Sequence, residues 1–151
     1  MTLRQRQPSL SAARTVPTPQ VLARHVQLPA RPSAVGRSRE WASEQLRLWG
    51  FAEDFVDTVE LVMSEFFTNA VIHTDSSFIA CSLRKAGGRL RIEVVDEGTG
   101  HSECAARQPN DEDINGRGLM LVDAVTDQWG VSTPTQGNGR VVWAELSHPS
   151  A

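Results

Sequence analysis

The sequence has a single lysine among its 15 basic residues, only two cysteines and no long hydrophobic run. Lys85 is not part of a Gly-Lys-Ser/Thr motif, which excludes a P-loop, and one lysine leaves little room for a protein-kinase fold with its strand lysine. No stretch approaches the ~20 apolar residues of a membrane span, and the N-terminus lacks the apolar segment of a secretory signal. Cys81 and Cys104 form no CxxC motif and have no histidine at zinc-ligand spacing, which favours a cytoplasmic protein with reduced thiols.

The remaining composition suits one domain of ordinary size. The chain has 151 residues, of which 40% are hydrophobic. Its 18 acidic residues exceed the 15 basic ones, and the formal net charge is −3. Because phosphate backbones are bound by clustered basic surfaces, this balance argues against a nucleic-acid partner.

The first 26 residues differ in composition from the rest. Residues 1–26 are rich in Arg, Gln, Ser, Thr and Pro and have little apolar periodicity, so we predict a disordered N-terminal arm. Its arginines could instead contact an acidic partner. A short edge strand is possible at 26–28, and the folded domain is expected to span 27–148.

Hydrophobic spacing predicts two helices followed mainly by strands. The helices are expected at 33–49, with Ser33 as the N-cap, and at 54–73. Strands follow at 78–84 and 89–96, joined by a Gly87-Gly88 hairpin turn; a loop over 97–115, a short helix after Gly118, and strands at 128–133 and 140–146 complete the chain. This order predicts an α+β fold: a two-layer sandwich in which helices cover one face of a mixed, mainly antiparallel sheet.

A polar pair lies on an otherwise apolar part of the second predicted helix. Glu65 and Asn69 are four residues apart, so they project from one helical face about 6 Å apart. Polar groups beside so much apolar surface are costly unless something satisfies them, and Mg²⁺ with a nucleotide would do so. The Asn69 carbonyl would then be a metal ligand, and Glu65 a base for an attacking hydroxyl or water. An ordinary polar helix edge would give the same pattern.

A second segment follows a predicted buried strand. Asp96 at the strand end could accept a hydrogen bond from an exocyclic amine, while Gly98 and Gly100 would let the backbone approach a planar ring. The alternative is a strand that ends in an ordinary turn, since Asp and Gly favour turns.

A third segment opens the short predicted helix. Gly116, Gly118 and Leu119 lie where backbone amides and the helix N-terminus favour a phosphate, and Arg117 could add a charge-assisted contact. A flexible loop that ends at a helix is the alternative.

The order and spacing of these three segments resemble those of a known superfamily, the histidine kinase-like (GHKL, Bergerat-fold) ATPases. Glu65-Phe-Phe-Thr-Asn69-Ala-Val-Ile-His73 is similar to its N box, Asp96-Glu-Gly98-Thr-Gly100 to its first glycine box, and Asn115-Gly116-Arg-Gly118-Leu-Met-Leu-Val to its second. Within the superfamily, the chain looks like the small anti-sigma factor serine/threonine kinases. The resemblance spans about residues 28–147.

The resemblance implies a role for each box. Asn69 would hold Mg²⁺, Glu65 would accept a proton from a substrate Ser or Thr hydroxyl, and Asp96 would bind the adenine amino group of ATP. The glycines of the first box would shape the pocket, and the second box would hold the phosphates under a lid formed by 101–115. A homodimer is also implied. Its partners would be a STAS-type anti-sigma factor antagonist, which it phosphorylates, and a sigma factor, which it keeps inactive.

Two departures from the family pattern bear on catalysis. Ile114 stands where related kinases usually have an arginine, although Arg117 could substitute. Val141 and Val142 lie on the last strand, where relatives often offer a threonine hydroxyl near the nucleotide. Neither change forbids ATP binding, but both weaken the case for phosphoryl transfer, which depends on positioning and on stabilising the charge of the γ-phosphate.

Three functions therefore remain open. The leading hypothesis is an ATP-dependent protein serine/threonine kinase that also acts as an anti-sigma factor. The second is a non-catalytic ATP-sensing module that sequesters a regulatory partner. A detached domain that phosphorylates histidine in another chain is less favoured, because the sequence has no phosphoacceptor helix pair.

Overall fold

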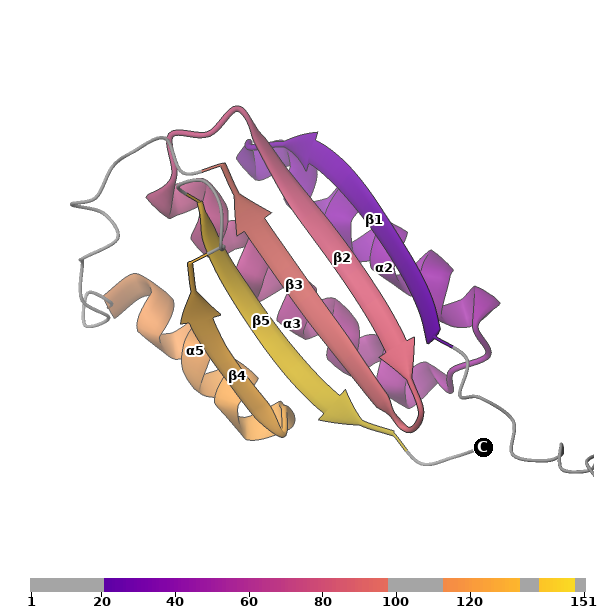
Figure 1. The fold of residues 1–151 in the computed structure, drawn as a ribbon. Helices are drawn as coiled ribbons and strands as arrows, with labels where there is room; N and C mark the ends of the chain where they lie inside the picture. Colours follow the sequence, from indigo (N-terminus) through magenta and orange to yellow (C-terminus); the bar gives the residue numbers. More distant parts are fainter. Residues whose placement is uncertain (1–20, 98–112, 134–138, 149–151) are drawn as a thin grey trace, which may run out of the picture.

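Five antiparallel strands form one sheet, and the helices cover one of its faces (Figure 1). The computed structural model describes residues 21–97, 113–133 and 139–148, and of residues 113–117 it describes the backbone alone. The strand order is β1-β2-β3-β5-β4. The elements are β1 (Val21–Pro29), the 3-10 helix η1 (Pro32–Ala34), α2 (Val35–Leu48), α3 (Glu53–His73), β2 (Phe78–Ala86), β3 (Arg89–Asp96), α5 (Asp113–Val125), β4 (Gln128–Ser132) and β5 (Arg140–Ser147). The predicted α+β sandwich is confirmed, and every strand pairing in the described chain is antiparallel.

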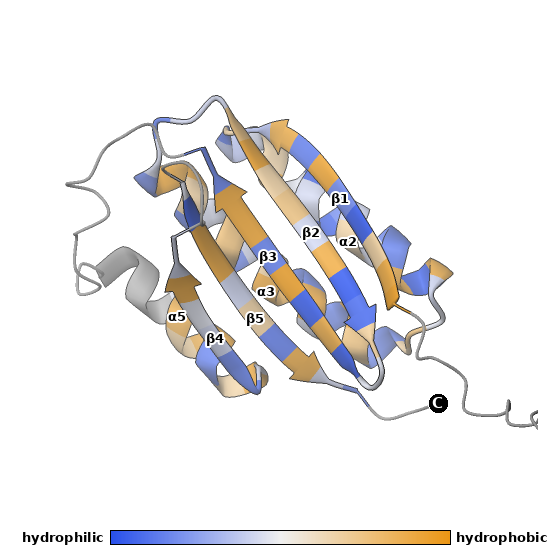
Figure 2. Cartoon of the chain, in the orientation of Figure 1, coloured by the Kyte–Doolittle hydropathy of each residue, from blue (hydrophilic) through white to orange (hydrophobic). Residues whose placement is uncertain are grey.

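Buried and more exposed side chains alternate along the strands, so one face of the sheet forms the hydrophobic core. Hydrophobic and hydrophilic residues alternate along β3, as Figure 2 shows. Side chains from alternate positions of β2, β3 and β5 are buried against α3, whose Phe66 and Phe67 are fully buried. The strand members of this core are Leu28, Ile79, Cys81, Leu83, Leu90, Ile92, Val94, Val142, Ala144 and Leu146.

Cys81 lies in this core as a free thiol, and burial raises its pKa to about 12. The thiol therefore stays protonated at neutral pH, and it behaves as a small apolar side chain. Cys104 lies outside the described residues.

The β2–β3 hairpin forms where the glycine pair predicted it. Gly87 has a φ of +61°, a conformation that an L-residue with a side chain rarely adopts. The register that follows pairs Ala86 with Arg89 and Ile79 with Asp96. The hairpin thus fixes which residues of β3 face the helices.

The N-terminal strand and two helix starts differ from the sequence-based predictions. β1 begins at Val21 and pairs along its whole length with β2, so the predicted arm over 1–26 overlaps the sheet from residue 21 onward. Arg24 interrupts the apolar alternation there, which hid the strand. Ser33 lies within η1 and makes no cap hydrogen bond, because α2 begins at Val35. α5 begins at Asp113 rather than after Gly118.

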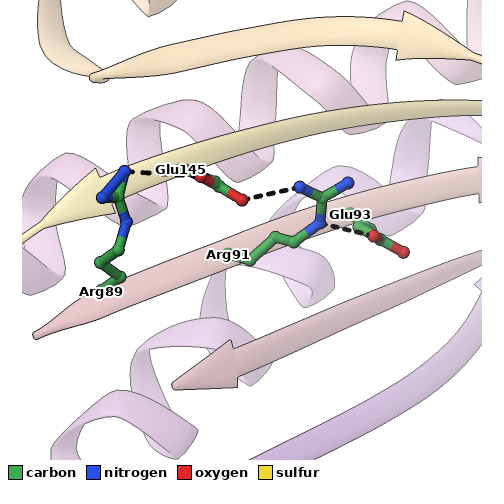
Figure 3. A network of polar contacts seen from close by, with 4 residues as sticks. All are labelled: Arg89, Arg91, Glu93 and Glu145. Carbon is green, nitrogen blue, oxygen red and sulfur yellow. Dashed lines mark hydrogen bonds and ion pairs between the residues drawn. The ribbon is translucent and has the colours of Figure 1, made fainter. Parts of the chain in front are cut away.

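The sheet face away from the helices carries a charged network between β3 and β5 (Figure 3). Arg91 donates to Glu93 Oε2 from Nε at 2.7 Å and to Glu145 Oε2 from Nη1 at 2.8 Å, and Arg89 Nη2 lies 3.5 Å from Glu145 Oε1. The Arg91 guanidinium also lies 4.5 Å from the centre of the Trp143 ring. The network therefore links β3 to β5 on the face of the sheet opposite to the core.

None of the helices in the part of the chain that the structure describes is long and apolar enough to cross a membrane.

Candidate functional site

The last turns of α3 present the first two predicted site residues. α3 begins with Glu53 and Asp54, whose charges suit a helix N-terminus, and it ends at His73, because Thr74 is extended. Asn69 is 8% exposed, and Glu65 on the same side is half-buried. An amide and a carboxylate are thus held at the edge of the core on a rigid helix.

Glu65 reaches directly to the second glycine box. A Cβ atom at position 118 would overlap Glu65 Oε1 and lie 2.9 Å from Glu65 Cδ. The carboxylate therefore occupies the space where a side chain at residue 118 would begin. Only glycine leaves this space open, so two of the three predicted segments meet here.

Gly118 lies against Glu65 because the second glycine box is part of helix α5. The predicted turn before the helix is replaced by a helix that already starts at Asp113, so Gly118 lies beyond the first turn. Its amide is therefore not among the first four, which lack a partner within the helix. In this structure Gly118 provides close approach for Glu65.

Asp96, the key residue of the second predicted segment, ends β3 on the helix-covered side of the sheet and is 5% exposed. Its Oδ1 accepts a hydrogen bond from the backbone N–H of Arg140 at 3.3 Å, and its Oδ2 lies 3.7 Å from Arg140 Nε. A Cβ at Gly139 would overlap the Asp96 carbonyl oxygen, so the start of β5 is packed closely on the end of β3.

Hydrogen bonds tie the end of β3 to the end of α3. Ser76 Oγ accepts from the backbone N–H of Glu97 at 2.7 Å, and the backbone N–H of Ser77 donates to Glu97 Oε1 at 3.3 Å. Thr74 Oγ1 lies 2.7 Å from Ser76 Oγ. The C-terminal end of α3, the end of β3 and the start of β5 therefore lie side by side at one end of the sheet (Figure 1).

The structure describes only part of the remaining predicted site residues. Gly98 and Gly100 lie outside the described residues, as do the side chains of Ile114 and Arg117, whereas the backbone of Gly116 lies in α5. Leu119 is half-buried and packs against the core. Within the described ranges, no group of three or more His, Cys, Asp or Glu residues could hold a metal ion.

The sequence analysis missed Gly139 and Arg140, which lie against Asp96. Glycine next to arginine at a strand start has no distinctive pattern, and both residues are far from Asp96 along the chain. Their closeness arises from the register of β3 with β5, which pairs Asp96 with Arg140. Only knowledge of that pairing could have identified them.

Comparison with known proteins places the chain in a family. The model of the histidine kinase-like ATPase domain matches residues 28–146. Among solved structures, the histidine kinase domain from the Erythrobacter litoralis EL346 blue-light activated histidine kinase matches with 23% sequence identity and a TM-score of 0.46. The match covers 79% of the present chain and 61% of the histidine kinase domain. The present chain therefore spans less than two thirds of the length of that solved structure. No curated protein matched the sequence. Because the family model covers most of the sequence, the chain belongs to the family of histidine kinase-like ATPase domains.

Proposed function

We propose that the protein binds ATP with Mg²⁺ and acts as a protein serine/threonine kinase and anti-sigma factor. The observation that supports this most is the position of Glu65, whose carboxylate lies against Gly118 of the second glycine box. A base held beside the segment expected to bind phosphate is placed to accept a proton from an attacking hydroxyl.

The residues present fit the nucleotide and the metal ion. Asn69 offers a hard oxygen ligand, and Mg²⁺ in nucleotide sites usually takes one or two protein oxygens besides phosphate and water. Asp96 offers a buried acceptor for the adenine amino group. Gly98 and Gly100, which follow it in the sequence, are proposed to shape the pocket on the strength of the resemblance. The backbone N–H of Gly116, in the first turn of α5, and the charge of Arg117 would bind the phosphates, while Gly118 leaves room for Glu65 beside them. When bound, Mg²⁺ would supply positive charge for the transferred γ-phosphate.

The proposed substrate and partners follow from the resemblance of the three boxes to those of anti-sigma factor kinases. The substrate would be a Ser or Thr hydroxyl of a STAS-type antagonist, and the second partner would be a sigma factor. A homodimer is proposed on the same ground. A cytoplasmic location is proposed from the cysteine pattern of the sequence.

Label transfer tests this function directly. The full chain would be incubated with γ-labelled ATP, Mg²⁺ and each STAS-type protein encoded near its gene. We expect one of these proteins to become labelled on Ser or Thr. ATP binding without transfer to any of them would contradict the kinase activity and leave the binding function.

A non-catalytic ATP-sensing module is the second candidate, and the last strand favours it. Val142 is 2% exposed in the core, and Val141 lies at the adjacent position on the other face of β5. Neither side chain offers a hydroxyl near Asp96, where a kinase of this family often has one. In this case Glu65→Ala would leave regulation of the partner intact.

The nucleotide site is tested by Asp96→Asn. The amide keeps the shape of the side chain but replaces one acceptor oxygen with a donor, so the adenine amino group loses its partner. We expect ATP affinity to fall by about 1–3 kcal/mol, measured by calorimetry. Asp57→Asn, an exposed carboxylate on α3, is the control. Unchanged affinity in Asp96→Asn would show that the base binds elsewhere.

The contact between Glu65 and Gly118 predicts the effect of Gly118→Ala. The added methyl group would displace the carboxylate, which can rotate away because its side chain is flexible. We expect transfer to slow by up to about 10²-fold, since small misplacements of catalytic groups have effects of this size. Stability should hold or rise, because alanine favours a helix by about 1 kcal/mol over glycine.

The matched control is Gly36→Ala in α2, where a Cβ would lie an ordinary 3.6 Å from Arg39 Nη2. Transfer at the wild-type rate in Gly118→Ala would show that Glu65 does not need its position in this structure.

A further inference from the structure

Arg140 stands directly opposite Asp96 in the pairing of β3 with β5. In an antiparallel pair, opposite residues point to the same face, so both side chains lie on the helix-covered side of the sheet. The Asp96 side chain is 6% exposed and that of Arg140 is 21% exposed. An arginine thus shares the largely buried position from which Asp96 would bind adenine.

Part of the Arg140 guanidinium is buried without a hydrogen bond. Within the part of the chain that the structure describes, neither Nε nor Nη2 has a hydrogen-bond partner. The nearest carboxylate oxygen, Asp96 Oδ2, is 3.7 Å from Nε, which is too long for a hydrogen bond. Nε and Nη2 form one edge of the planar guanidinium and can donate two parallel hydrogen bonds.

A buried donor without an acceptor is unfavourable, and more so when it is charged. The next two positions of β5 are Val141 and Val142, whose side chains offer no acceptor to the guanidinium. A ligand that brings an acceptor to this edge would remove the cost. It would have to do so next to the carboxylate of Asp96.

Adenine has the matching pattern on its edge. Its 6-amino group is a donor, and the ring nitrogens N1 and N7 on either side of it are acceptors. We propose that Arg140 is a specificity-determining residue, whose Nε–Nη2 edge donates to a ring nitrogen of adenine while Asp96 accepts from the amino group. This rests on the proposed binding of ATP, and it assigns a contact to a residue outside the three boxes.

Base discrimination follows from the same arrangement. In guanine the 6-amino donor is replaced by a keto oxygen, which would face the Asp96 carboxylate. ADP is therefore preferred over GDP, and Asp96 is the source of that preference. Arg140 strengthens it where its edge donates to N1, which is an acceptor in adenine but carries a proton in guanine, whereas N7 accepts in both bases.

The experiment measures binding of ADP, 1-deaza-ADP, 7-deaza-ADP and GDP to the full chain by calorimetry. The proteins are the wild type, Arg140→Leu, Arg140→Lys and, as a control, Arg84→Leu, which removes an exposed arginine of β2. We expect one of the two deaza analogues to bind the wild type about tenfold more weakly than ADP, because it lacks the accepting nitrogen.

Arg140→Leu should bind ADP about tenfold more weakly than the wild type, and the same analogue should then cause no further loss. Arg140→Lys keeps the charge but not the two-donor edge, so its affinity for ADP should lie between those of the wild type and Arg140→Leu. This variant provides the readout if Arg140→Leu does not fold. Arg84→Leu should match the wild type. If the analogue lowers the binding affinity equally in the wild type and in the Arg140 variants, the two changes act independently. That result would overturn the contact between Arg140 and the ring nitrogen.

Tighter binding of ADP to the Arg140 variants would also overturn it, because the guanidinium would then compete with adenine for Asp96. So would tighter binding of GDP than ADP to the wild type. Absence of ADP binding to the wild type would overturn the proposed function and this contact together, whereas the other contrary results overturn the contact alone.

Discussion

Glutamine in place of Glu65 is expected to slow phosphoryl transfer by about 10²–10⁴-fold, the usual contribution of a general base. The amide has the same size and can occupy the space against Gly118, but it cannot accept the proton of the substrate hydroxyl. ATP affinity and the melting temperature should change little. The rate of label transfer under single-turnover conditions measures the effect, with ATP affinity followed separately.

Glu40→Gln provides the matched control for Glu65→Gln, since Glu40 is an exposed carboxylate of α2. Transfer should proceed at the wild-type rate in this variant. A Glu65→Gln protein that transfers phosphate as fast as the wild type would rule out Glu65 as the base. Loss of partner regulation in Glu65→Ala would count against the non-catalytic module, which requires no chemistry from this residue.

Alanine in place of Gly139 is expected to lower the free energy of unfolding by about 3 kcal/mol, the upper end for overpacking. Its Cβ would overlap the Asp96 carbonyl oxygen and lie 3.4 Å from the Asp96 carbonyl carbon. These are backbone atoms, which cannot rotate away as the Glu65 side chain can, so β3 and β5 must separate locally. Asp96 would move with them, and ADP affinity should fall as well.

Urea unfolding measures the first effect and calorimetry with ADP the second. Gly88→Ala is the matched control, because its Cβ would lie 3.9 Å from the His148 carbonyl oxygen, an ordinary contact. We expect this control to be neutral or more stable by about 0.4–1 kcal/mol. Wild-type stability in Gly139→Ala would show that the two strands are less closely packed here than the structure indicates.

The fold could be predicted from the sequence wherever a local pattern determined it. The β2–β3 hairpin followed from alternation and from a glycine pair, and the bounds of β3 were predicted as they are observed. The start of β1 was missed because Arg24 breaks the apolar alternation. This part of the strand is held by its pairing with β2, which is distant in sequence. The start of α5 was missed because glycines at 116 and 118 lower helix propensity, which the contacts of α5 with α3 and β4 offset.

For the candidate site, the sequence could propose residues but not their contacts. Glu65 and Asn69 were singled out because polar groups on an apolar helix are costly unless something satisfies them. Asp96 was singled out because an aspartate at the end of a buried strand can accept a hydrogen bond from an exocyclic amine. What the sequence did not reveal is the contact of Glu65 with Gly118, or the position of Arg140 beside Asp96. Both depend on tertiary packing between elements that are distant in sequence, which periodicity and motif spacing do not report.

The pairing of Arg91 with Glu145 also bears on the alignment of Asp96 with Arg140, the residues proposed to bind the base. These two residues are opposite each other on one face of β3 and β5, and Asp96 and Arg140 are opposite each other on the other face, so a single register aligns both pairs. A slip of one residue would turn Asp96 away from the helices and at the same time separate Arg91 from its carboxylate. Misaligned folding intermediates therefore lose both pairs at once. Insertions or deletions in the chain between the two strands should accordingly leave the alignment of Asp96 with Arg140 intact.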